Sequence, residues 1–326
     1  MIEPRKPIAA FDFNAAAGGS FMTPGGKDFA IRLWFWMSAA MAIVFIVTIP
    51  FFIGGYGDVL EQSWISNRNL LGGGEPPDPE AMLVAFGKII PGMLLFTLGL
   101  WAVTAAGETA LYRRYFHDRE ASRQPLRFGR EELRTMLCQL GVWALVFFIY
   151  FLAIIILSIL GGVLSVISPV LMAIVIITGV FALLALFIFI PVRLAPAAAL
   201  SMQRNKTHLL AASKVTKHRF WSLFVAYLVT YLGGYIAYYI IYMITIGIAT
   251  GDMGFLMAIS GLGEENPRIL FEAAAERMKS PLGMLLGILA MIINAAALSA
   301  WILLVAGVNS YAVRWWTTDD PIPSFD

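Results

Sequence analysis

The chain has 326 residues, of which 59% are hydrophobic and 13% are charged, and its mean hydropathy is +0.77. Soluble domains are about half apolar and about a quarter charged, so this composition excludes an ordinary soluble fold and indicates a membrane protein. The single cysteine, Cys138, excludes a disulfide framework and a multi-cysteine metal site. With only three histidines beside it, we predict no metal and no cofactor.

Six apolar segments reach the length of about 20 residues that a helix needs to cross a bilayer core. Backbone polar groups must be satisfied inside the hydrocarbon, and these segments are far too long for the strands of a barrel. We therefore predict an all-α polytopic membrane bundle with six transmembrane helices. In chain order these cover residues 29–53, 83–111, 136–164, 169–192, 220–249 and 282–313.

No polar stretch is long enough for a second folded domain. We predict an N-terminal segment over 1–28, a six-span domain over 29–313 and a tail over 314–326. Residues 54–82 are predicted to form a non-cytoplasmic loop.

The last non-cytoplasmic loop contains a short predicted helix. Asn266-Pro267 is typical of an N-cap and first helical position, which predicts a helix over 268–279 that Ser280-Pro281 ends. This helix either lies along the outer boundary of the membrane or is a plain surface helix.

Positive charge is distributed unevenly over the connecting segments. Of the 23 Lys and Arg residues, 18 lie in the N-terminal segment together with the first turn of span one, in the segments after spans two and four, and after the last span. Basic connections stay in the cytoplasm, so both termini are predicted to be cytoplasmic.

Basic and large apolar residues recur together at 27–32, 131–136 and 217–221, just before each odd-numbered span. This pattern predicts three hairpins introduced by cytoplasmic interfacial segments, or it reflects what any point of membrane entry looks like.

Two stretches around the fourth and fifth spans carry a family resemblance. They read PVRLAPA over residues 191–197 and AASKVTKHRFWSL over residues 211–223. This signature resembles the YciC-type family of uncharacterised bacterial membrane proteins, and it is similar to the membrane domain fused to some glycerophosphodiester phosphodiesterases. Phe11-Asp12-Phe13 is similar to their opening segment, whereas Lys217-His218 departs from the usual small and basic pair. The resemblance implies a bacterial inner-membrane location and a link to envelope or lipid homeostasis, without catalytic residues.

Enzyme signatures are weak in this sequence. Gly55-Tyr56-Gly57-Asp58 matches the Gly-x-Gly-Asp pattern of intramembrane aspartyl proteases, which need a second aspartate on a neighbouring span. No predicted span contains an aspartate, and zinc-protease, serine-hydrolase and phosphate-loop motifs are absent from the sequence. We therefore predict that the chain is not an enzyme.

Tyrosines form a stripe on the fifth span, within an arc of roughly 80°. They are Tyr227, Tyr231, Tyr235, Tyr238 and Tyr242. Each hydroxyl needs a partner in hydrocarbon, and Asn294 on the last span is the predicted one. Two interpretations are open: the rings fill space between helices, or they line a groove for a lipid or an amphipathic substrate.

Charged residues define two further candidate sites, since the middle of every predicted span is uncharged. Glu108 and Arg193 lie at inner span ends and are predicted to form an interfacial charge pair. A net positive loop is predicted to contact anionic lipid head groups, at about 1 kcal/mol per basic residue, or to act only as a topology signal. Its candidate residues are Arg204, Lys206, Lys214, Lys217 and Arg219.

These features favour a non-enzymatic integral inner-membrane protein that contacts lipids or an envelope partner. Transport of a lipidic substrate, as by a flippase, is one alternative. It is disfavoured because the prolines at positions 50, 91, 169 and 191 lie near span ends and predict no broken helix. An accessory subunit of a larger membrane complex is another. The predicted partners are membrane lipids, another membrane protein or a second copy, and not nucleic acid.

Overall fold

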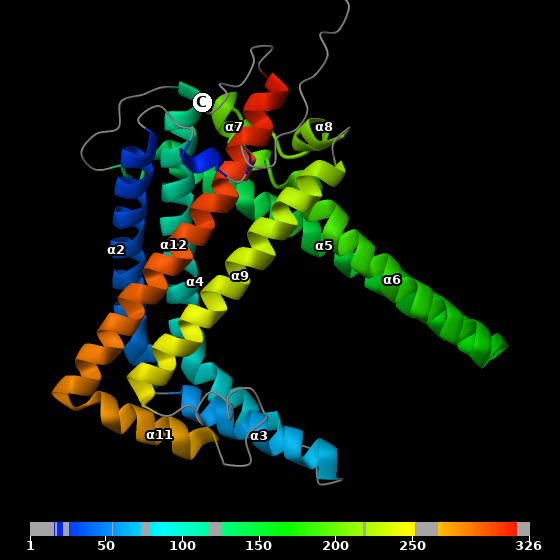
Figure 1. The fold of residues 1–326 in the computed structure, drawn as a ribbon. Helices are drawn as coiled ribbons and strands as arrows, with labels where there is room; N and C mark the ends of the chain where they lie inside the picture. The colour runs from blue at the N-terminus through cyan, green and yellow to red at the C-terminus, as the bar shows by residue number, and fades with distance from the viewer. Residues whose placement is uncertain are drawn as a thin grey trace, which may run out of the picture. The chain divides into compact units, whose positions relative to one another are not determined.

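The computed structural model describes residues 16, 18–21, 26–53, 55–72, 79–117, 125–217, 220–251 and 267–317, and every regular element in these ranges is helical (Figure 1). A 3-10 turn, η1, covers Gly19–Phe21. The α-helices are α2 (Gly26–Ile53), α3 (Tyr56–Gly72), α4 (Pro79–His117), α5 (Arg130–Ile167), α6 (Pro169–Leu194), α7 (Ala197–Gln203), α8 (Ala212–Thr216), α9 (Phe220–Thr250), α11 (Pro267–Met278) and α12 (Pro281–Thr317).

Six helices of the described chain are long and apolar enough to cross a membrane, at the positions that the sequence predicted. The chain is therefore a multi-pass, all-α membrane protein. The helices α4 and α5 extend further at their adjoining ends than predicted, because their charged residues continue the helix beyond the apolar run. Pro50, Pro91 and Pro191 lie inside α2, α4 and α6, and none of them breaks its helix.

The predicted non-cytoplasmic loop contains a helix that the sequence did not reveal. Helix α3 covers most of that loop, and its polar composition concealed it. The short helix predicted in the last loop is confirmed as α11. Ser280 then caps α12, since the Gly283 backbone N–H donates to Ser280 Oγ at 3.1 Å and Pro281 takes the first helical position. Asn266 lies outside the described residues.

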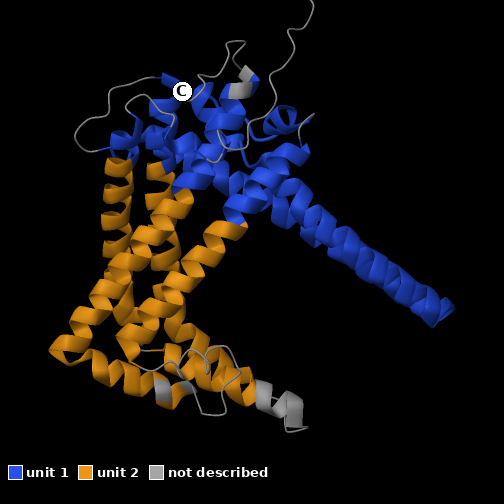
Figure 2. Ribbon diagram, viewed as in Figure 1, with its two compact units in different colours: residues 1–30, 108–231, 303–326 blue, residues 31–107, 232–302 orange. Residues whose placement is uncertain are grey.

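The chain divides into two compact units (Figure 2). Unit 1 takes residues 1–30, 108–231 and 303–326, and unit 2 takes residues 31–107 and 232–302. The helices α2, α4, α9 and α12 contribute residues to both units.

Within unit 1, α5 and α6 form a tight antiparallel hairpin. A single residue, Ser168, separates the two helices, and its Oγ accepts from the Leu171 backbone N–H at 3.4 Å. Further along, Tyr150 donates from its hydroxyl to the Leu183 carbonyl at 2.8 Å. Most of the hairpin surface is apolar and exposed, as expected for a segment that hydrocarbon covers. The exposed side chains include Phe147, Phe151, Ile159, Val166, Ile177 and Phe181.

Within unit 2, α2 and α4 approach closely at two glycines. A Cβ at Gly92 would lie 2.6 Å from the Cβ of Phe51, and one at Gly99 would lie 2.9 Å from Val44 Cγ1. Only hydrogen fits at these positions, so the glycines allow the two helices to approach closely.

The second pair of long helices in unit 2, α9 and α12, is joined by polar contacts. Asn294 Nδ2 donates to Thr245 Oγ1 at 2.6 Å and to the Ala290 carbonyl at 2.8 Å. The Trp34 indole N–H of α2 donates to the Ala296 carbonyl at 2.8 Å. These bonds satisfy polar groups internally, as a bilayer interior requires.

The two short helices of unit 2, α3 and α11, pack against each other. The rings of Tyr56 and Phe271 have centroids 5.7 Å apart. Arg268 on α11 contacts Glu61 at 2.6 Å and Asp58 at 3.5 Å, both on α3. Aromatic packing and ion pairs together explain how these polar segments hold a defined position.

Replacing Gly92 by leucine should destabilise unit 2, because the new side chain meets Phe51 where no space exists. We expect a loss of about 1–3 kcal/mol, the usual cost of overpacking. Gly87→Leu on the same helix is the matched control, since no atom lies within 4 Å of its added Cβ. Unfolding midpoints in detergent, followed by tryptophan fluorescence, measure the difference. Equal midpoints for the two variants would contradict the close approach.

Candidate functional site

A row of buried polar pairs joins the end of α4 to the start of α5 in unit 1. It comprises Glu108–Gln139 at 3.0 Å, Thr109–Thr135 at 2.7 Å and Arg113–Glu132 at 2.7 Å, and we call it the polar ladder. On α5 the ladder residues are three and four apart, and on α4 Arg113 follows Thr109 by four residues, with Glu108 directly before Thr109. The order of the partners is reversed between the helices, which run in opposite directions. Sequence reasoning missed these pairs, because it used the charges around them only as a topology signal.

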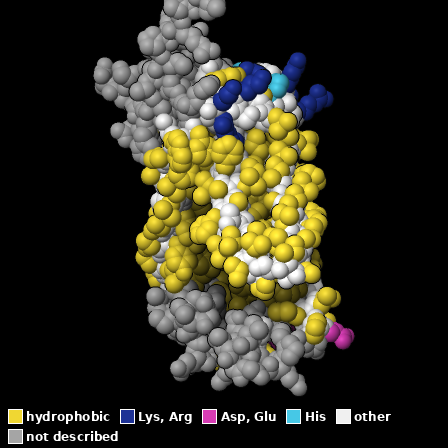
Figure 3. Space-filling model, turned by 90° about the vertical axis from the view of Figure 1, so that its right-hand side faces the viewer, with side chains coloured by type: hydrophobic (Ala, Val, Ile, Leu, Met, Phe, Trp, Pro, Cys, Tyr) yellow, Lys and Arg dark blue, Asp and Glu magenta, His cyan; other side chains and the backbone are white. Residues whose placement is uncertain are grey.

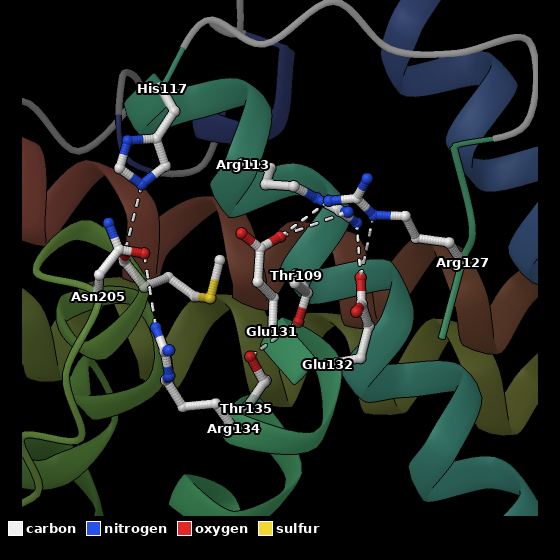
Figure 4. A network of polar contacts seen from close by, with 10 residues as sticks. Thr109, Arg113, His117, Arg127, Glu131, Glu132, Arg134, Thr135 and Asn205 are labelled. Atoms are coloured by element: carbon white, nitrogen blue, oxygen red, sulfur yellow. Dashed lines mark hydrogen bonds and ion pairs between the residues drawn. The ribbon is translucent and has the colours of Figure 1, made fainter. Parts of the chain in front are cut away.

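The ionic end of the polar ladder is a four-residue network (Figure 4). Arg113 also contacts Glu131 at 3.5 Å, and Arg127 reaches Glu131 at 2.9 Å and Glu132 at 3.8 Å. The side chains of Arg113 and Glu132 are only 9% and 1% exposed. The network contains two arginines and two carboxylates, so their formal charges cancel, and its buried part is the Arg113–Glu132 pair.

Helix α7 is held against α5 beside the polar ladder. Residues 197–202 are all buried. Ser201 Oγ lies 3.5 Å from Cys138 Sγ and accepts from the His208 backbone N–H at 2.9 Å. A ring nitrogen of His117 lies 3.2 Å from the Met202 carbonyl. These contacts fix the position of the C-terminal end of α7, where the next segment begins.

Asn205 ends α7 in the left-handed conformation, at φ 53°. Its N–H donates to the Met202 carbonyl at 3.3 Å, and the Lys206 N–H donates to the Ser201 carbonyl at 3.2 Å. This is the Schellman pattern, and asparagine is one of the few residues that tolerate this conformation. The local sequence thus turns the chain sharply after α7.

The turn after α7 begins the basic segment, which we define as residues 204–217. Its described basic residues are all exposed and form no ion pair with any described acidic residue: Arg204, Lys206, Lys214 and Lys217. Arg204 stacks over the Trp316 ring at 5.2 Å, which fixes its direction. The fifth predicted residue, Arg219, lies outside the described residues.

The basic segment adjoins the apolar hairpin of unit 1, since α7 packs on α5 and α8 packs on α6. In the face shown in Figure 3, Lys and Arg side chains gather along one edge of a continuous apolar surface. Exposed cations next to exposed hydrocarbon form the two parts of a surface that suits an anionic lipid.

The predicted Glu108–Arg193 pair does not form. Glu108 Oε2 accepts from the Tyr112 hydroxyl and from Gln139, each at 3.0 Å. Arg193 donates instead to the Ser213 carbonyl at 3.1 Å and stacks on the Phe189 ring. Arg193 thus fixes the chain around α8, and the charge of Glu108 is left without a cation among the described residues.

The tyrosine stripe splits into different environments. Tyr227 in unit 1 is buried, and its hydroxyl donates to Asn309 Oδ1 at 2.6 Å. Tyr231 and Tyr235 are half exposed. In unit 2, Tyr238 stacks with Tyr242 at 6.2 Å between ring centroids. A groove along these rings stays a prediction.

Asn294 was the predicted partner of the tyrosines, but its amide bonds to Thr245 and Ala290. Asn309, about one turn before the predicted span end, accepts from the Tyr227 hydroxyl instead. Both asparagines have the right chemistry, and the sequence does not say which one lies opposite a given ring.

No protein-family model, curated protein or solved structure matches the chain.

Removing the Glu132 carboxylate should destabilise the protein strongly, because Arg113 would remain buried with an incomplete set of partners. Breaking a buried ion pair costs about 3–5 kcal/mol, so Glu132→Ala should lower the unfolding free energy by about that amount. Arg127→Ala is the control within the same network, as its side chain is 58% exposed and should cost at most about 1 kcal/mol. Chemical denaturation in mild detergent measures both, and similar losses would argue against a special role for the buried pair.

Proposed function

We propose that this chain is a non-enzymatic integral protein of a bacterial inner membrane, and that its basic segment binds anionic lipid head groups. The observation that supports this most directly is the set of four exposed, ion-pair-free basic residues beside the apolar α5–α6 hairpin. Anionic lipids attract such residues by about 1 kcal/mol each near the membrane surface. Membership of the YciC-type family is part of the proposal, and residues 191–223 carry it.

The orientation of the basic segment belongs to the same proposal. Anionic lipids at the cytoplasmic leaflet would meet the segment only if the basic side of the chain is cytoplasmic. The N-terminal end of α2, the C-terminal ends of α4, α6 and α12 and the N-terminal ends of α5 and α9 all belong to unit 1. The charge distribution assigns these ends to the cytoplasm. Unit 1 also contains the opposite end of the α5–α6 hairpin, so the support for the orientation is the charge distribution itself.

Neutralising two lysines of the basic segment should weaken lipid binding. We expect Lys206→Gln with Lys214→Gln to reduce the affinity for phosphatidylglycerol by about 2 kcal/mol, or about 30-fold. Native mass spectrometry of protein released from nanodiscs of phosphatidylglycerol and phosphatidylethanolamine measures the bound lipid.

The matched control for lipid binding removes two lysines of unit 2, as Lys88→Gln with Lys279→Gln. It changes the net charge equally, and it should leave phosphatidylglycerol binding as in the unaltered chain. An equal loss in both double variants would mean that only total charge matters and would contradict the proposed site. Movement of labelled lipid between leaflets in proteoliposomes would favour the alternative of a flippase.

The orientation can be read from two single cysteines. Cys138 is buried, so the unaltered chain should not react with a membrane-impermeant maleimide. In intact bacterial cells we expect Lys279→Cys to be labelled once the reagent crosses the outer membrane, and Lys214→Cys to be labelled only after the inner membrane is opened. The reverse pattern would invert the topology and remove the cytoplasmic lipid contact.

A further inference from the structure

The Glu108 carboxyl in unit 1 lacks the charge compensation that Glu132 has. It is 8% exposed, and both of its hydrogen bonds, from the Tyr112 hydroxyl and the Gln139 amide, go to the same oxygen, Oε2. Neither donor is charged. No lysine, arginine or histidine of the described chain forms an ion pair with Glu108, and Oε1 accepts no hydrogen bond from a described residue.

Residues from the helices around Glu108 provide only neutral groups. The titratable side chains in electrostatic contact with it are Tyr112 on α4, Cys138 on α5, and Tyr227 and Tyr231 on α9. Tyrosine and cysteine are ordinarily uncharged near neutral pH, so none of them offsets a negative charge.

The contribution of α12 to this centre is also neutral. Asn309 accepts from Tyr227 at 2.6 Å, and its amide Nδ2 lies 3.5 Å from the Tyr112 hydroxyl oxygen. The nearest arginine along α4, Arg113, pairs with Glu132 and Glu131. The cation closest in sequence is therefore already engaged elsewhere.

A buried carboxylate without a cation carries a desolvation cost of several kcal/mol, and such groups commonly become neutral by taking up a proton. A protonated carboxyl has one O–H donor and keeps acceptor capacity on its carbonyl oxygen. At Glu108, Oε2 can keep both of its hydrogen bonds while a proton adds to Oε1. The site thus accommodates both forms without rearrangement of Tyr112 or Gln139.

We propose that Glu108 is a proton-binding site, in which an O–H bond forms at Oε1 with a proton from water and breaks again as the pH rises. The step involves no oxidation and no other reactant. Proton binding there stabilises the fold, because it removes the uncompensated charge between α4, α5, α9 and α12. The site is independent of lipid binding by the basic segment.

The test uses the full chain in nanodiscs, with infrared spectra recorded from about pH 5 to about pH 8, the range in which most proteins are most stable. We expect the carbonyl stretch of a buried carboxylic acid, lost in Glu108→Gln and retained in the exposed control Glu272→Gln. The folded chain holds a proton that the unfolded carboxyl releases, so stability falls as the pH rises. The folding equilibrium of the unaltered chain, relative to that of Glu108→Gln, should weaken by up to about tenfold per pH unit.

Two outcomes would overturn the proposal. One is a spectrum without this band in the unaltered chain, or with the same band in Glu108→Gln. The other is stability that follows sodium or potassium concentration at fixed pH, which would assign the site to a metal cation. Tyr112→Phe provides a second variant if Glu108→Gln fails to fold. It removes one donor from Oε2, so the acid band should persist to higher pH, and an unchanged titration would also count against the proposal.

Discussion

The polar ladder between α4 and α5 is the interaction on which unit 1 depends. A bilayer offers no water to satisfy polar groups, so side chains buried near its boundary must find partners within the protein. The polar ladder solves this with one amide–carboxyl, one hydroxyl–hydroxyl and one ionic pair along antiparallel helices. Because the three pairs form together at only one alignment of the helices, the ladder sets the relative register of α4 and α5.

The register of α5 in turn sets the position of the basic segment, which we propose to bind lipid head groups. Cys138 and Gln139 are neighbours, so the turn of α5 that completes the polar ladder also presents Cys138 to Ser201 of α7. Ser201 then holds the chain beyond the Asn205 turn, where the basic segment begins. A loop with several lysines would ordinarily lose order through its long, hydrated side chains. Here its first residues are anchored to a buried helix, so the cations have a defined position beside the apolar hairpin.

The sequence was sufficient to predict the six membrane spans and insufficient to predict how they pair. The length of the apolar segments predicted all six spans, because every helix that crosses a bilayer must match the thickness of its hydrocarbon core. Helix α3 was not predicted, because a segment outside the hydrocarbon need not have the apolar length of a membrane span.

The Glu108–Arg193 prediction failed for a different reason. Both residues lie at inner span ends, but helix rotation decides whether charges at one depth can meet, and neutral donors such as Gln139 carry no signal that stands out in a sequence. Helix rotation also decides that Asn309, and not Asn294, lies opposite the Tyr227 hydroxyl.

Glu108 and Glu132 are both buried between α4 and α5, but Glu132 has charged partners and Glu108 has neutral ones. Glu132 is almost fully buried, and two arginines, Arg113 and Arg127, form ion pairs with it. Glu108 has only neutral donors, so its charge depends on whether a proton is bound. The two acids are therefore not interchangeable. A cation beside Glu108 would hold it in the ionised form, and no described lysine, arginine or histidine forms an ion pair with it, which is why we propose proton binding there. On this proposal, a proton bound at Glu108 acts on the packing of the helices that contribute to its surroundings, α4, α5, α9 and α12.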